Sequence, residues 1–264
     1  MFACRLCGHT QLKLQYEQGR ERQFKFYRCP ICRLVNYDLS GGTDQGKYAE
    51  EYPDPLDDDL KTNRLQTMTF RFLQRHSRQI PAGKLLDIGC GNGRLLYLCR
   101  EGGWDVKGLE LSPFLAESVT KRLKIDVKTA DFMSYKPTEM GSFDLVILRH
   151  VLEHIPDSLH AMRSIRSLLK PGGHALMEFP NIDGIDFRMK RWMTRLGLSR
   201  KRYAEGYRPG HCNEFCKTSF EYLANRTGFR LKVWETYSNK ESLNPYYGRI
   251  KIGGKARLIA EKIE

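Results

Sequence analysis

The chain lacks any long hydrophobic stretch. No run of about 18 apolar residues, the minimum for a transmembrane helix, occurs in its 264 residues. The N-terminus also lacks the apolar core of a signal peptide. We therefore expect neither a membrane span nor export, and the sequence predicts a cytoplasmic protein.

Acidic residues are scarce relative to basic ones: 31 Asp and Glu stand against 44 Lys and Arg, which gives a formal net charge of +13. This excess favours an anionic partner, such as RNA, an anionic membrane surface or a phosphate-bearing small substrate. No aromatic and basic RNA-binding module is visible, which counts against RNA.

Disulfide spacing is not evident among the eight cysteines, because four of them form a metal pattern. Cys4-x-x-Cys7 is followed, after 21 residues, by Cys29-x-x-Cys32. Four thiolates at this spacing predict a closed tetrahedral zinc site with no open position for chemistry. So small a segment needs the metal in order to fold. We expect a structural zinc ribbon with one Zn²⁺ over residues 1–47, serving as a folding and docking unit or as a clamp on substrate or partner.

The next segment, residues 48–80, reads as a linker and a leading helix. It carries six acidic residues and two prolines between 48 and 60, and then an apolar helical pattern from about Leu60 to His76. The remainder, residues 81–264, has the length of one domain.

Residues 85–93 are the most informative part of that domain and read Leu-Leu-Asp-Ile-Gly-Cys-Gly-Asn-Gly. The pattern predicts a buried strand, a glycine turn and a helix from Arg94. Glycine permits positive φ and close approach of the backbone to a ligand. Such turns occur at both dinucleotide and S-adenosylmethionine (SAM) sites. Asp87 favours SAM, since a carboxylate repels pyrophosphate and tolerates a sulfonium and an ammonium group.

Further acidic residues end the following strands. Glu110 closes a strand about twenty residues after the first glycine, where it can hold both ribose hydroxyls of a nucleoside. Asp131 and Phe132 end a third strand, where the carboxylate can accept from an adenine amino group and the ring can flank the base. Strands at 143–150 and 174–180 enclose a helix that Lys170-Pro-Gly-Gly stops. This alternation predicts a parallel α/β sheet.

Together these motifs resemble, in order, those of the class I SAM-dependent methyltransferases over roughly residues 80–180. The resemblance implies a Rossmann-like, seven-stranded, mostly parallel sheet with helices on both faces and an antiparallel last strand. Segments 229–237 and 255–263 fit the two closing strands by their alternation. It also implies SAM as the cofactor, bound by residues of the strand ends and turns: Asp87, Gly89, Cys90, Gly91, Gly93, Glu110, Leu111, Asp131, Phe132, Arg149 and His150.

A basic insertion spans residues 181–210, with eight Lys and Arg against two acids between Asp186 and Arg208. On a helical wheel Met189, Trp192, Met193 and Leu196 share one face. Three interpretations remain open: an amphipathic lid packed over the active site, a helix that contacts an anionic membrane or a lipid-linked phosphate, and a contact to RNA phosphates.

Two histidines are candidate catalytic bases, because a neutral hydroxyl is a poor nucleophile and needs its proton removed. They are His154, after the fourth strand, and His211, after the basic insertion. Related sugar and quinone methyltransferases often have a histidine followed by aromatic residues at the second position, where Cys212 and Asn213 follow here.

The ribbon, the tyrosine-containing acidic linker and the catalytic domain together resemble methyltransferases of glycan and secondary-metabolite tailoring. We therefore expect a SAM-dependent methyltransferase that acts, at oxygen, on a small or glycan-type acceptor such as a sugar, nucleotide-sugar or lipid-linked glycan. The alternatives are an RNA (rRNA) methyltransferase and a non-catalytic SAM-binding or partner-binding protein.

Overall fold

The computed structural model describes residues 2–44, 60–135, 139–198, 202–238 and 244–264. Most of the expected acidic linker, residues 45–59, lies outside the described residues. The chain forms two compact units. Unit 1 comprises Met1–Gln45, His150–Arg163 and Met177–Ile259; unit 2 comprises Gly46–Arg149, Ser164–Leu176 and Ala260–Glu264.

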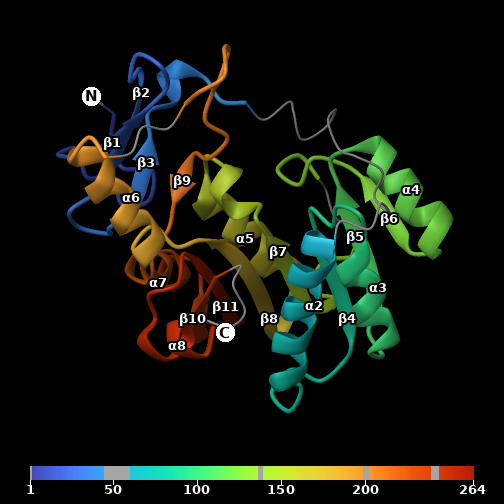
Figure 1. The fold of residues 1–264 in the computed structure, drawn as a ribbon. Coiled ribbons are helices and arrows are strands. Elements are labelled where there is room, and N and C mark those ends of the chain that lie inside the picture. The colour runs from blue at the N-terminus through green and yellow to red at the C-terminus, as the bar shows by residue number, and fades with distance from the viewer. Residues whose placement is uncertain (1, 45–59, 136–138, 199–201, 239–243) are drawn as a thin grey trace. The chain divides into compact units, whose positions relative to one another are not determined.

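The larger sheet has seven strands in the order β10-β11-β8-β7-β4-β5-β6 (Figure 1). Their bounds are β4 Lys84–Ile88, β5 Asp105–Glu110, β6 Asp126–Thr129, β7 Phe143–Arg149, β8 Leu169–Pro180, β10 Phe229–Tyr237 and β11 Lys255–Lys262. The pairs β4–β5, β4–β7 and β5–β6 are parallel. The Rossmann-like, mostly parallel fold is therefore confirmed, as are the two closing strands.

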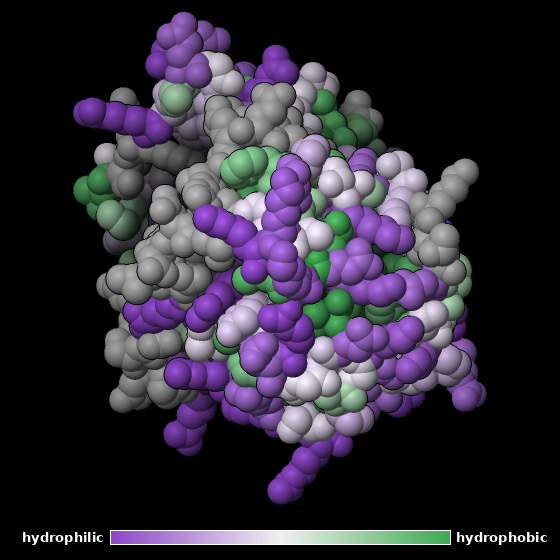
Figure 2. All heavy atoms as spheres, turned by 90° about the vertical axis from the view of Figure 1, so that its right-hand side faces the viewer, coloured by the Kyte–Doolittle hydropathy of each residue, from purple (hydrophilic) through white to green (hydrophobic). Residues whose placement is uncertain are grey.

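Helices alternate with these strands: α2 Leu60–Arg75, α3 Arg94–Glu101, α4 Pro113–Leu123, α5 Ser158–Leu168, α7 Lys217–Arg226 and α8 Asn244–Ile250. In unit 2, α3 and α4 pack on β5. Helix α3 does so by burying Leu95, Leu96 and Cys99, the apolar stripe of an amphipathic helix. Figure 2 views the side that carries α3 and α4, where hydrophilic residues dominate and apolar patches are small.

A second sheet, in unit 1, has the order β1-β2-β3-β9. The strands β1 Lys13–Gln18, β2 Phe24–Arg28 and β3 Val35–Tyr37 come from the cysteine-rich segment, and β9 Asn213–Glu214 comes from the segment after the basic insertion (Figure 1). The core of this sheet combines Phe24, Phe26, Val35 and Tyr37 with Ile182 and Cys216. The antiparallel pair β1–β2 lies between the two cysteine pairs, and unit 1 builds it into a larger core.

One local feature differs from the expectation. The strand expected at 174–180 begins at Leu169, directly after α5, so Lys170-Pro-Gly-Gly lies within β8. A Cβ on Gly173 would come within 3.1 Å of the Phe143 carbonyl oxygen, so glycine lets the backbone approach the neighbouring strand closely.

The basic insertion contains α6 Ile185–Arg195. Three of its apolar residues are turned to solvent: Met189 is 54%, Trp192 61% and Leu196, just after the helix, 54% exposed. Phe187 packs against the core of the four-stranded sheet instead. Among the described residues, no helix is long and apolar enough to cross a membrane.

Candidate active site and metal centre

The glycine turn after β4 lies in unit 2 and is tied to the end of β5. The Gly89 N–H donates to the Leu109 carbonyl at 2.7 Å. Gly91 has φ +56° with open space where a Cβ would stand, while a Cβ on Gly93 (φ +70°) would lie 2.6 Å from Val119. Gly91 therefore leaves room beside the backbone for a ligand, and Gly93 permits close packing of α4.

Glu110, at the end of β5, closes this turn. Its Oε2 accepts from the Gly91 N–H at 2.8 Å and its Oε1 from the Ser112 N–H at 3.1 Å. The side chain is buried, and each carboxylate oxygen has two lone pairs. These two bonds use one lone pair on each carboxylate oxygen.

The other cofactor residues expected in unit 2 lie around the same strand ends. Asp87, Cys90 and Phe132 are buried, and Leu111 is 43% exposed. Asp131 is exposed, and its Oδ1 accepts from the Met133 N–H at 2.9 Å. Burial raises the pKa of the Cys90 thiol well above its usual value, which favours the neutral thiol.

Sequence reasoning missed Gln66 of α2, whose Nε2 donates to Asn92 Oδ1 at 2.9 Å. The same oxygen accepts from the Arg94 N–H at 3.2 Å. Asn92 stands inside the glycine motif, but nothing in the spacing of α2 indicated that a glutamine would contact it.

Arg149 is the last residue of β7, in unit 2, and His150 begins the part of unit 1 that follows. His150 has φ +55°, a conformation that side chains rarely adopt outside functional or turn positions. Its N–H donates to the Glu178 carbonyl at 2.7 Å, and its Nδ1 lies 3.3 Å from Glu153 Oε1.

The two candidate bases lie together in unit 1. The rings of His154 and His211 meet edge to face with centroids 4.9 Å apart. One ligand-type atom each of Glu153, His154 and His211 lies within 4.8 Å of the others. Glu153 is 1% exposed, and its Oε2 has no hydrogen-bond partner within the described residues. The fold thus brings a buried carboxylate oxygen beside two imidazoles that are 57 positions apart in sequence (211 − 154).

The electrostatics of this cluster favour the neutral form of His154. Burial lowers the pKa of His154, and the neighbouring Glu153 offsets this only in part. His154 Nδ1 lies 2.9 Å from the Gly210 carbonyl oxygen, so Nδ1 carries the proton and Nε2 is the acceptor nitrogen. Burial alone would raise the pKa of Glu153, but the His150 hydrogen bond and the histidine charges outweigh it, and the pKa is lowered. A neutral imidazole beside a carboxylate is suited to take a proton.

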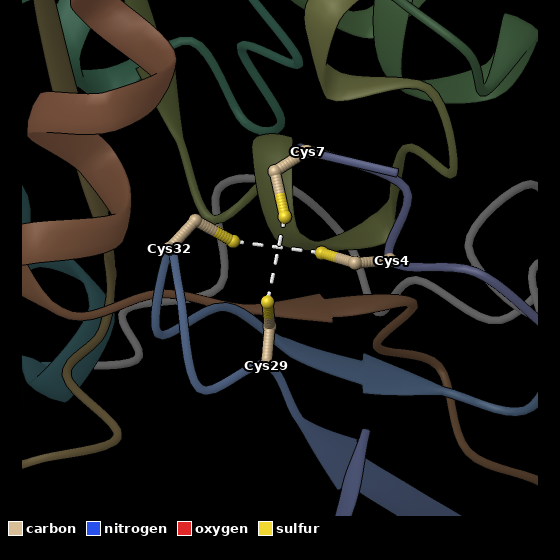
Figure 3. A group of neighbouring side chains, drawn as sticks. All are labelled: Cys4, Cys7, Cys29 and Cys32. Carbon is tan, nitrogen blue, oxygen red and sulfur yellow. Dashed lines mark hydrogen bonds between the residues drawn. The ribbon is translucent and has the colours of Figure 1, made fainter. Parts of the chain in front are cut away.

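The four cysteines expected as metal ligands come together at one point (Figure 3). Cys4 Sγ lies 3.5 Å from Cys32 Sγ, and Cys7 Sγ lies 3.4 Å from Cys29 Sγ. Ligands at about 2.3 Å from a tetrahedral Zn²⁺ lie about 3.8 Å apart, so the sulfur spacing fits such an ion after slight expansion. All four thiols belong to the loops that flank the four-stranded sheet.

The matches to known proteins extend this geometry. A family model described as a methyltransferase domain matches residues 60–232, which is well over half of the chain. The chain belongs to this methyltransferase family. It is an S-adenosylmethionine-dependent methyltransferase of class I, as its sheet order and its motifs also indicate.

Similar proteins include two that are named ubiquinone biosynthesis O-methyltransferase. The protein from Xanthomonas campestris is 26% identical over 173 residues, covering 62% of this chain and 72% of that protein. The protein from Xanthomonas axonopodis is 33% identical over 177 residues, covering 63% and 74%. A SAM-dependent methyltransferase from Archaeoglobus fulgidus has the same fold, with 19% identity, a TM-score of 0.55 and coverage of 75% of this chain and 94% of its own.

Proposed function

We propose that this methyltransferase transfers its methyl group to a hydroxyl oxygen of a small acceptor, with His154 as the general base. The observation that carries the proposal is the state of His154: partly buried, with a lowered pKa, and anchored through Nδ1 on the Gly210 carbonyl. The relatives named O-methyltransferase support oxygen as the methylated atom. Among acceptors, small hydroxylated molecules come first, and sugar-type acceptors remain within that class.

Each residue is assigned its part in the chemistry by its own surroundings. When bound, SAM would supply an electrophilic methyl group, and its sulfur would be the leaving group as the acceptor oxygen takes the methyl. We propose that Glu110 accepts the ribose hydroxyls and that Asp87, Asp131 and the glycine turn hold the rest of the cofactor. His154 takes the acceptor proton on Nε2, and Glu153 stabilises the imidazolium that results.

His211 is the second candidate for this role. Its Nδ1 lies 3.7 Å from Glu214 Oε1, a contact too long for a good hydrogen bond. We propose that His211 orients the acceptor and the His154 ring, because the centroids of the two rings lie 4.9 Å apart.

The test uses the purified full chain and tritium-labelled SAM with four acceptor pools: hydroxylated quinone precursors and phenols, nucleotide-sugars, lipid-linked glycans, and undermodified ribosomal RNA. We expect label in a small hydroxylated acceptor. Label in RNA alone would overturn the proposal in favour of an RNA methyltransferase. Label in none of the pools, with SAM bound tightly, would favour the non-catalytic alternative.

A variant then tests the base. His154→Gln should lower kcat by about 10²–10⁴-fold, the usual contribution of a general base, with the Kd for SAM nearly unchanged. His160→Gln is the matched control, because His160 is exposed on the adjacent helix α5 and should leave kcat unchanged. An unaffected kcat in His154→Gln would remove His154 from the mechanism and leave His211 as the base.

We also propose that the four-cysteine centre holds one structural Zn²⁺, since the sulfur spacing fits a closed tetrahedral shell. Four thiolate ligands leave no coordination position for substrate. The role of the ion is therefore to hold the loops of the ribbon, and it takes no part in the methyl transfer.

The exposed face of α6 supports a third proposal, peripheral contact with an anionic membrane. Met189, Trp192 and Leu196 are each more than half exposed, and Arg188 and Lys190 on the same helix are exposed as well. Apolar side chains flanked by cations fit the boundary between anionic headgroups and acyl chains. A lipid-linked or lipophilic acceptor would be reached from such a position.

Vesicle sedimentation tests the membrane contact. Binding to phosphatidylglycerol vesicles should exceed binding to phosphatidylcholine vesicles and weaken as salt rises. Trp192→Ala removes an aromatic side chain that is 61% exposed; inserting a large apolar side chain is worth about 1.5–3 kcal/mol, so affinity should fall by roughly 10- to 150-fold. Phe114→Ala, which alters an aromatic side chain that is 58% exposed on α4, is the control. Equal binding of the two variants would refute the role of α6.

A further inference from the structure

Arg5, between the first two metal-pattern cysteines, reaches across unit 1 to the segment that follows His211. Its Nη1 donates to the Tyr37 carbonyl at 2.9 Å, and its Nε donates to Asn213 Oδ1 at 3.2 Å. Its Nη2 donates to the Cys212 carbonyl. Three of the five guanidinium donors are therefore used on two segments that are far apart in the sequence.

The segment that Arg5 contacts, Cys212 and Asn213, is also hydrogen-bonded to the turn that carries His154. The Cys212 N–H donates to the Glu153 carbonyl at 2.8 Å, and Asn213 Nδ2 donates to the Ile155 carbonyl at 2.7 Å. Cys212 Sγ lies 3.3 Å from the His154 carbonyl oxygen. The backbone on both sides of His154 is thus fixed by the two residues that follow His211.

The ribbon sheet strengthens the same connection. Strand β9 pairs with β3, with Asn36 opposite Asn213, and the Tyr37 N–H donates to the Cys212 carbonyl at 3.0 Å. Asn36 also accepts from the Arg5 N–H at 3.0 Å. The cysteine-rich segment, the His211 segment and the His154 turn therefore form one continuous hydrogen-bonded array.

We propose that the cysteine-rich ribbon contributes to the acceptor site through Arg5. Arg5 is a positioning residue that fixes the His154–His211 pair. The metal-pattern cysteines on either side of Arg5 hold the loop from which it projects. This inference rests on the proposed function in one respect, the role of the two histidines in handling the acceptor. It also gives the ribbon a role in catalysis beyond folding.

Arg5→Lys and Arg5→Ala test the proposal, the first keeping the charge and losing the planar fork of donors. Both should retain one zinc per chain and the wild-type Kd for SAM. Displacing the base by about an ångström should lower kcat by roughly 10- to 100-fold, with a smaller change in KM. We expect the larger loss in the alanine variant and partial recovery in the lysine variant.

Histidine side-chain NMR gives a readout that needs no acceptor. The ring signals of His154 and His211, assigned through His154→Gln and His211→Gln, should both move in Arg5→Ala. Arg226→Ala is the matched control. Arg226 Nη1 donates to the Leu6 carbonyl in the same cysteine loop, at 2.8 Å, so its removal perturbs that loop without removing a bond from Arg5 to the His211 segment.

Unmoved ring signals in a folded, zinc-loaded Arg5 variant would overturn the proposal. So would ring signals that move while kcat stays at the wild-type value, because Arg5 would then have no catalytic consequence. If the wild-type chain methylates no acceptor, the proposed function fails by itself, and the NMR comparison still decides whether Arg5 holds the two histidines. If Arg5→Ala does not fold, the same measurements on Arg5→Lys decide the question.

Discussion

Replacing Glu110 should weaken SAM binding, and the structure permits an estimate of the effect. The buried carboxylate accepts from two backbone N–H groups, at 2.8 Å from Gly91 and 3.1 Å from Ser112, and we expect it to accept from the cofactor ribose as well. In Glu110→Ala the ribose hydroxyls lose a charged acceptor, which costs about 1–3 kcal/mol. At 1.4 kcal/mol per factor of ten, the Kd should rise roughly 5- to 150-fold.

A second substitution separates ribose contact from turn geometry. Glu110→Gln keeps one acceptor oxygen and places an NH₂ group against a backbone N–H, so one of the two turn contacts is lost. We expect an intermediate Kd. Glu117→Ala, on the exposed surface of α4, removes a carboxylate of the same type and should leave the Kd unchanged.

Isothermal titration calorimetry with SAM, and in parallel with NADH, is the appropriate assay. Circular dichroism should show that all three variants are folded. A folded Glu110→Ala chain that binds SAM with the wild-type Kd would refute the assignment of Glu110. Binding of NADH with none of SAM would refute the cofactor itself.

Three further predictions follow from the same geometry. Freshly purified protein should contain about one zinc per chain, and Cys29→Ser should release it and open residues 1–45 to proteolysis; metal analysis without zinc would contradict this. The pKa of His154 is lowered in the fold, so kcat/KM should fall on the acid side only below about pH 6.5, the pKa of a free histidine. The stability that His154 contributes to the fold should be present above that pH and be lost as pH falls below it. Arg257→Met should lower the free energy of unfolding, measured by urea titration, by about 3–5 kcal/mol. The substitution leaves the carboxylate of Glu178, which is 1% exposed, without its ion-pair partner. Recovery of stability in a double variant with Glu178→Leu would show that this unpaired charge is the cause.

Most of the correct predictions rest on local sequence patterns, in which neighbouring residues act on their own backbone. The apolar run, the glycines and the helical pattern of residues 85–101 are neighbours in the sequence, and each acts on its own backbone. The closing strands were found for the same reason, by their alternation. The cysteine spacing also led to the correct cluster, because each pair forms a tight local loop. The surroundings of α6 could not be predicted in this way: the sequence shows an apolar face, but only the structure shows that Met189 and Trp192 on that face are exposed.

The amino-acid sequence by itself therefore determined the order of strands and helices, the glycine turn that ends β4 and the gathering of the four cysteines. Only the tertiary structure decided that Asn213 pairs with Asn36, that Arg5 reaches Cys212, and that Glu153 contacts His150 while its Oε2 has no hydrogen-bond partner among the described residues. The physical reason is that secondary structure and metal loops depend on residues a few positions apart. The environment of a buried charge or imidazole, in contrast, depends on segments that meet only when the chain has folded.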